Sequence, residues 1–287
     1  MAASAPFVIL AIRSVYPLTG NALTERSATV TTLGSTLAAG GVRRPTAAAA
    51  RPAAAAAAVL IQAVPGVPRF QDNGGPVIAS VQLQLIFWGS TWSTSPSPPV
   101  DAVAGAVQGI VSGPYMTGLA QYRGVGPGTL AASVLATTSD PPDPFSNQDV
   151  ENLLSGLLAA GSLPSPATDA ALLFLVIVPA GVKSQENFDG EHSSYDWQGT
   201  SVHYGWLTHD GQLDSLTTIL SHELVESATD PEGTAIVGVP GTCGTRSGWC
   251  EIGDICEDCA QCTGQVGGVK VQAYWSDQDQ ACIIPGS

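Results

Sequence analysis

Residues 213–229 read LDSLTTILSHELVESAT, and the fold prediction starts from this segment. Its four leucines recur at steps of three and four, which predicts a helix with one apolar face. His222 and Glu226 are four residues apart, so they lie one helical turn above each other. We expect the leucines to pack into the core and this pair to face a cleft, with Glu223 beside it.

Apolar runs on either side of the helix predict a sheet. Residues 171–178, ALLFLVIV, are typical of a central strand that is buried on both faces. Residues 77–88, VIASVQLQLIFW, predict a second buried strand. The other expected elements are helices over residues 98–120 and 147–160 and strands over residues 130–135, 201–207 and 269–274. This mixture predicts an α+β fold with a mixed sheet packed on the helix.

Charge divides the chain near residue 70. Residues 1–69 hold six arginines and one acid, whereas residues 70–287 hold four basic residues and 23 acids. Residues 47–58, AAAARPAAAAAA, offer no apolar face to bury, and proline interrupts any helix there. We therefore expect residues 1–70 to be a disordered leader, linker or pro-segment and residues 71–287 to be the domain. A net charge of −14 argues against nucleic-acid binding, and no apolar run is long enough to span a bilayer.

All six cysteines lie between Cys243 and Cys282. An even set in a Gly-rich tail predicts disulfides that staple the C-terminal subregion of an exported protein. A bridge between Cys256 and Cys282 would fasten the segment that follows the helix. The alternative is a zinc knuckle of Cys256, Cys259 and Cys262, although a fourth ligand at matching spacing is missing.

The helix has the layout of an H-E-x-x-H metallopeptidase helix, with two ligands at i and i+4 and a general base at i+1. His222 and Glu226 would be the ligands and Glu223 the base, since a carboxylate oxygen binds zinc at about the same distance as an imidazole nitrogen. The alternative is a solvated helix face with an ordinary His-Glu pair.

Residues 249–254, WCEIGD, resemble the third-ligand segment of the thermolysin-like gluzincins. The resemblance implies that Glu251 is the third zinc ligand and that Asp254 orients His222, although this chain is one residue shorter between the two acids. Asp230 is the alternative third ligand if the chain turns back after the helix. An acidic loop or a calcium site that includes Glu257 and Asp258 is the other alternative.

A longer resemblance covers most of residues 75–287. Residues 74–77 (GGPV), 87–89 (FWG) and 226–231 (ESATDP) are similar to the phosphate-induced, EXORDIUM-like proteins. Their bacterial and fungal relatives carry H-E-x-x-E-x-x-T-D-P followed by E-I-G-D-x-C, whereas the plant members lack His and Glu at the positions of His222 and Glu226. The resemblance implies an exported protein whose scaffold occurs with and without the metal set.

These features lead us to expect a zincin-like fold and a secreted, monomeric zinc metallopeptidase that acts on peptide or protein substrates. His192 and His203 are candidates for contact with the developing oxyanion or the substrate, and the alternative, which the sequence favours, is a structural or surface histidine at each position. The first alternative is a non-catalytic extracellular EXORDIUM-like protein of the cell wall or surface. The second is a binding module stabilised by structural calcium.

Overall fold

The computed structural model describes residues 40–43, 68–239, 242–243, 250–257 and 262–287. Its centre is a seven-stranded mixed sheet in the order β1-β7-β8-β6-β3-β4, with β5 also paired to β3. The strands are β1 (Gly40–Arg43), β3 (Ser80–Trp88), β4 (Gly126–Leu130), β5 (Val134–Ala136), β6 (Leu172–Ile177), β7 (Phe188–Trp197) and β8 (Thr200–Leu207). The predicted α+β class with a mixed sheet is confirmed.

The direction of the strands changes at one edge of the sheet. Strands β4, β5, β3, β6 and β8 run parallel to one another. Strand β7 is antiparallel to β8, and β1 is antiparallel to β7. Strand β6 is buried at every position, as its unbroken apolar sequence predicts.

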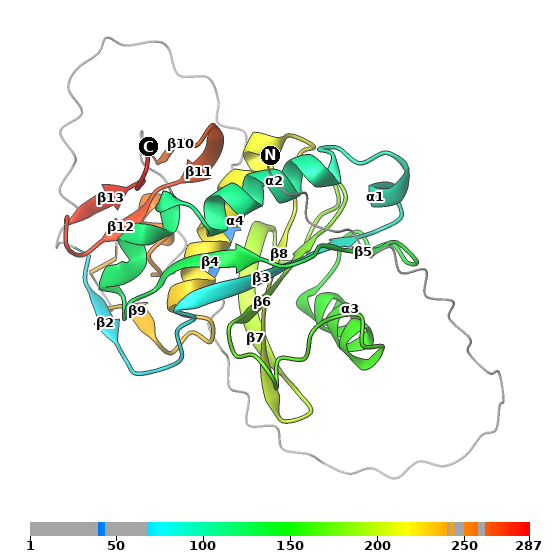
Figure 1. Cartoon of the computed structure of the whole chain (residues 1–287), viewed down its shortest axis with the longest axis horizontal. Helices are drawn as coiled ribbons and strands as arrows, with labels where there is room; N and C mark the ends of the chain where they lie inside the picture. The colour runs from blue at the N-terminus through cyan, green and yellow to red at the C-terminus, as the bar shows by residue number, and fades with distance from the viewer. Residues whose placement is uncertain (1–39, 44–67, 240–241, 244–249, 258–261) are drawn as a thin grey trace.

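Helices cover both faces of the sheet. Helices α2 (Val100–Val111) and α4 (Leu213–Thr229) lie on one face and α3 (Asn147–Ala159) lies on the other (Figure 1). Ser146 caps α3 and forms a capping box with Asp149. The shorter elements are α1 (Thr91–Thr94) and two 3-10 helices, η1 (Pro114–Gln121) and η2 (Asp254–Cys256).

The expected single helix over residues 98–120 is divided in two. Helix α2 ends at Val111, and η1 begins at Pro114 after an extended Gly113. Proline has no N–H to continue the α-helical hydrogen-bond pattern and disfavours helical geometry in the residue before it. The chain therefore turns there, and η1 packs its own apolar side chains under α4.

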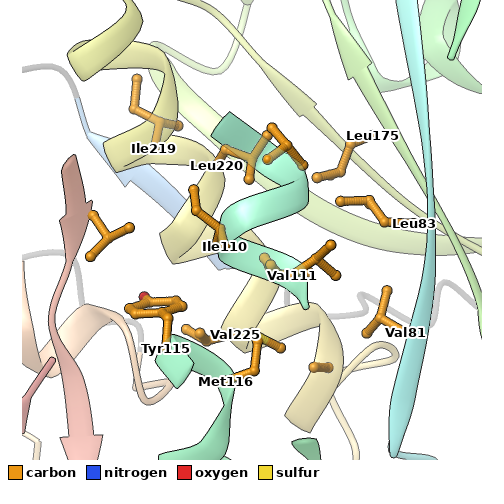
Figure 2. Packing of buried hydrophobic residues seen from close by; sticks show 14 of the residues in the cluster. Val81, Leu83, Ile110, Val111, Tyr115, Met116, Leu175, Ile219, Leu220 and Val225 are labelled. Atoms are coloured by element: carbon orange, nitrogen blue, oxygen red, sulfur yellow. The ribbon is translucent and has the colours of Figure 1, made fainter. Parts of the chain in front are cut away.

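Two apolar cores lie on the two faces of the sheet. In the larger one, side chains of β3 and β6 meet those of α2, η1 and α4, as Figure 2 shows for Leu83, Leu175, Ile110, Met116 and Leu220. The smaller core lies under α3. Alternate residues of each central strand point to opposite cores, as a pleated strand requires.

Helix α4 is buried nearly all round, which differs from the expected single packed face. Between Leu216 and Thr229, only Thr218 falls outside the buried residues. The face opposite the leucines is covered by β7 and by β11 (Val269–Gln272). His222, Glu223 and Glu226 therefore lie inside the protein.

The C-terminal subregion consists of small antiparallel pairs held by disulfides. The pairs are β2 (Phe70–Asp72) with β9 (Ile236–Gly238), β10 (Thr263–Val266) with β11, and β12 (Tyr274–Ser276) with β13 (Ala281–Ile283). Cys256 is bonded to Cys282 and Cys243 to Cys250. The disulfide staple is confirmed, including the predicted Cys256–Cys282 bridge. The zinc-knuckle alternative is excluded for Cys256, whose sulfur is in that bridge, and Cys262 is also disulfide-bonded.

Part of the predicted leader belongs to the fold. Residues 40–43 form β1, Arg69 exchanges hydrogen bonds with Val239 and Thr242, and Phe70 begins β2. Residues 1–39 and 44–67 lie outside the described residues. Within the described part of the chain, no helix is both long enough and apolar enough to cross a membrane.

Candidate functional site

Five carboxylates and two imidazoles gather on the covered side of α4. Strand β7 supplies one residue, α4 and its C-cap supply four, and the last two come from the loop before η2 and from the first residue of η2. Each of the seven is at most 6% exposed. They are His192, His222, Glu223, Glu226, Asp230, Glu251 and Asp254. The structure thus brings six of the expected residues around His222 into one buried cluster.

The helical pair His222 and Glu226 faces the centre of the cluster. The distance from His222 Nε2 to Glu226 Oε2 is 3.1 Å. Two ligands that each lie 2.0–2.2 Å from an ion at the tetrahedral angle are about 3.3–3.6 Å apart. The spacing of this pair is close to that range.

The loop that follows the helix holds Glu226 in place. Glu226 Oε1 accepts hydrogen bonds from the backbone N–H groups of Gly253 and Asp254, both at 3.1 Å. The same loop is fastened to the domain by the Cys256–Cys282 disulfide and by the bond from the Trp275 N–H to the Ile252 carbonyl. One carboxylate oxygen is therefore fixed, and Oε2 is left facing the histidines.

His192 lies closer to the centre of the cluster than its expected role implied. Its Nδ1 is 3.3 Å from Glu223 Oε2, and its Nε2 is 3.3 Å from both Glu251 Oε1 and the Asp230 carbonyl. Burial lowers the pKa of His192, but the carboxylates of Glu251, Glu223 and Glu226 outweigh burial and raise that pKa well above its usual value. Each ring nitrogen of His192 thus faces acceptor oxygens.

Glu251 and Asp254 both belong to the cluster. The Glu251 N–H donates to Asp254 Oδ2 at 2.9 Å, which sets the conformation of the loop. Burial raises the pKa of Glu251 to about 7 and raises that of Asp254 well above its usual value. In the calcium alternative, Asp258 lies outside the described residues.

Gln272 contacts His222 where Asp254 was expected. Its side-chain amide lies 2.7 Å from His222 Nδ1 and donates to the Gly253 carbonyl at 3.0 Å. The amide nitrogen therefore faces Nδ1, and the other ring nitrogen, Nε2, faces Glu226. No motif marks Gln272 in the sequence, since it ends an ordinary strand.

The two remaining candidates have separate roles. Asp230 caps the end of α4, and its Oδ1 accepts the N–H groups of Thr234 and Ala235, so one of its two oxygens is already occupied. His203, on β8, pairs with Glu232 at 3.1 Å. None of the contacts described for His203 reaches a residue of the cluster.

Several buried polar atoms of the cluster have no well-formed hydrogen bond among the described residues, although His222 Nε2 lies 3.1 Å from Glu226 Oε2 and Glu251 Oε1 lies 3.3 Å from His192 Nε2. They are His222 Nε2, Glu223 Oε1, Glu226 Oε2, Asp230 Oδ2, both side-chain oxygens of Glu251, and Asp254 Oδ1. Two groups of three residues, each with ligand atoms within 4.8 Å of one another, share Glu226: His192, Glu223 and Glu226, and His222, Glu226 and Asp254. The arrangement can hold a metal ion.

Comparison with known proteins adds no family to this description. The chain matches no protein-family model, no curated protein and no solved structure. The functional argument therefore rests on the geometry of the cluster.

Proposed function

We propose that this protein is a secreted, zinc-dependent peptidase whose metal ion is held by the cluster on α4. The observation that carries the proposal is the convergence around Glu226 Oε2 of buried ligand atoms that lack a well-formed hydrogen bond, with five carboxylates against two imidazoles. Burying a carboxylate or an imidazole without a partner is costly. A divalent cation would satisfy several of these atoms at once and offset the excess of carboxylates.

His222, Glu226 and Asp254 are the residues that fit the ion best. Each has an unpartnered buried atom, and their ligand atoms lie within 4.8 Å of one another. Glu251, with two unpartnered oxygens, is the fourth candidate and the third ligand expected from the sequence. A set that includes an imidazole nitrogen favours zinc, because calcium prefers six to eight oxygen ligands.

Glu223 is suited to proton transfer beside such a site. When bound, a zinc ion acts as a Lewis acid that activates water or polarises a carbonyl oxygen. Glu223 Oε2 receives the N–H of His192, and its Oε1 lacks a partner. We infer that Glu223 takes the proton of the attacking water and passes it to the leaving amine. His192 orients both Glu223 and Glu251.

The surrounding fold supports a zincin-like peptidase and export. The helix that carries H-E-x-x-E packs against β7, the antiparallel strand of an otherwise parallel set. Backbone groups along such a strand can bind an extended peptide. The Cys243–Cys250 and Cys256–Cys282 disulfides favour an oxidising, extracellular environment.

Metal analysis of the purified chain tests the proposal. After zinc loading and dialysis, we expect about one zinc per chain in the wild type and loss of the zinc in Glu226→Gln, and hydrolysis of fluorescein-labelled casein should require zinc. The control is Glu151→Gln on α3, where glutamine still accepts the hydrogen bond from Tyr204. Retention of calcium in place of zinc, or of no metal at all, overturns the proposal.

A further inference from the structure

The outer edge of β7 is occupied by a strand from the N-terminal leader. Residues 40–43 form β1, which pairs antiparallel with β7 and ends the sheet on that side. The register places Gly40 opposite His192, Gly41 opposite Glu191 and Val42 opposite Gly190. On its other side β7 pairs with β8. Because of β1, the part of this edge from residue 188 to residue 192 is closed to any other peptide.

The occupied stretch of β7 is the part that reaches the candidate site. His192 extends from it to Glu223 and Glu251, and β1 itself lies against α4. Residues directly opposite each other in an antiparallel pair share one face of the sheet. Position 40 is therefore on the face of His192, where glycine adds no side chain. The backbone of β1 thus runs beside the cluster in an extended conformation.

We propose that β1 is a latch: an intramolecular strand that occupies a peptide-binding edge of β7 and keeps extended peptides from the cluster. Addition of a strand to a free sheet edge is a general mode of peptide recognition, in which backbone hydrogen bonds provide the affinity. The proposal rests on the proposed function, because closing this edge would affect catalysis only if the cluster is a peptidase site. It names the ligand class as an extended peptide bound antiparallel to β7.

Two features favour a removable strand over a permanent edge cover. β1 has four residues, and residues 44–67 separate it along the chain from the next described segment. Residues 1–69 hold six arginines and residues 70–287 hold 23 acids. The attraction between these opposite charges favours the return of β1 after it has opened. A short strand at the edge of a sheet opens at lower free-energy cost than a central one, and being covalently attached it closes again efficiently.

Two prolines in β1 would open the latch in the full chain. Proline has no N–H to donate and is excluded from paired strand positions, so Gly41→Pro with Val42→Pro disrupts the pairing whichever N–H faces β7. The matched control is Ala55→Pro with Ala56→Pro in the alanine tract of the same leader. The probe is a dye-labelled synthetic peptide of residues 37–46, LAAGGVRRPT.

We expect the β1 double-proline variant to bind this peptide at least about tenfold more tightly than the wild type or the control, measured by fluorescence anisotropy. Backbone amides of residues 188–192 should also exchange with solvent faster in that variant. Equal peptide binding in all three proteins, or unchanged exchange, overturns the latch. A variant that fails to fold shows that β1 is an integral strand, which also overturns it.

The same proteins separate the latch from the peptidase proposal. Peptide binding and hydrogen exchange report on the edge of β7 without any turnover. If the variant binds the peptide but the zinc-loaded variant leaves labelled casein intact, the latch stands and the peptidase proposal fails. If labelled casein is hydrolysed equally by the wild type and the variant, the latch fails and the peptidase proposal stands.

Discussion

Gly253 approaches Glu226 so closely that a side chain at this position would meet the carboxylate. Its N–H donates to Glu226 Oε1 at 3.1 Å, and a Cβ atom there would stand 2.8 Å from Oε1 and 2.9 Å from His222 Nδ1. Its φ of −76° is one that any residue adopts. Glycine is therefore required by the close approach and not by the backbone conformation.

Gly253→Ala should disturb the cluster by crowding alone. The added methyl group must displace Glu226 or His222, so we expect a loss of about 1–3 kcal/mol in the free energy of unfolding. Zinc affinity should fall at least about tenfold, as it does when the partners of metal ligands are disturbed. Urea unfolding and zinc titration measure the two effects.

The matched control is Gly156→Ala in α3. A Cβ atom at Gly156 would meet nothing within 4 Å, and alanine favours a helix over glycine by about 0.5–1 kcal/mol. This variant should gain stability and keep its zinc affinity. Equal behaviour of the two variants would contradict the assigned role of Gly253.

Gln272→Glu tests whether His222 binds the metal through Nε2. The amide nitrogen of Gln272 faces Nδ1 and donates to the Gly253 carbonyl, so it offers no acceptor to a proton on Nδ1. A carboxylate at position 272 would accept a proton from Nδ1, free Nε2 for the ion and raise the basicity of the ring. Without metal it would add a buried charge. The rise in melting temperature on zinc addition should therefore be larger than in the wild type.

The control for this substitution is Gln121→Glu. Gln121 is a partly buried amide that also donates to a backbone carbonyl, that of Gly118 at 2.9 Å, and among its described contacts it does not touch the cluster. Its zinc-induced shift should equal that of the wild type. A smaller shift for Gln272→Glu than for the wild type would remove His222 from the ligand set.

Much of the frame of the fold is predictable from sequence, because local patterns specify it. The leucine spacing of α4 predicts its bounds, Leu213–Thr229, as the structure has them. Ser146 predicts the start of α3 through its capping box. The apolar run of β6 predicts a central strand. In each case, the residues that decide the structure are neighbours in the chain.

The strands that complete the site depend on distant partners. Strand β7 reads FDGEHSSYDW, and this polar composition does not predict a strand. The strand forms because it pairs with β8 and packs against α4. Strand β1 pairs with residues about 150 positions later in the chain. Gln272 meets His222 only because β11 runs along α4. No local pattern records such pairings, so the sequence predicts that His192 lies near the cleft but does not predict its contacts.

Glu191 lies on the face of β7 opposite His192, and Glu191→Gln should stabilise the protein in a pH-dependent way. Burial raises the pKa of Glu191 from 4.5 to about 7, so the folded state holds this proton more tightly than the unfolded chain. The stability penalty therefore grows as pH rises from about 4.5 and is complete above about 7. Glutamine keeps the bond from Asn147 Nδ2, now 2.7 Å. We expect a gain of about 1–3 kcal/mol at pH 8 and almost none near pH 4.5, measured by urea unfolding. Equal gains at both pH values would contradict it.

Glu223→Gln separates proton transfer from metal binding. Strand β7 meets Glu223 directly, since a Cβ atom at Gly190 would lie 2.6 Å from Glu223 Oε1, and glutamine preserves this fit. Glutamine cannot accept the proton of an attacking water, so hydrolysis of labelled casein should fall by about 10²–10⁴ while zinc content stays at the wild-type value. The assay uses the Gly41→Pro, Val42→Pro background so that β1 does not mask turnover, with Glu151→Gln as the control that keeps full activity. Loss of zinc in Glu223→Gln would instead make Glu223 a ligand, in the set with His192 and Glu226, and unchanged hydrolysis would place the proton acceptor elsewhere.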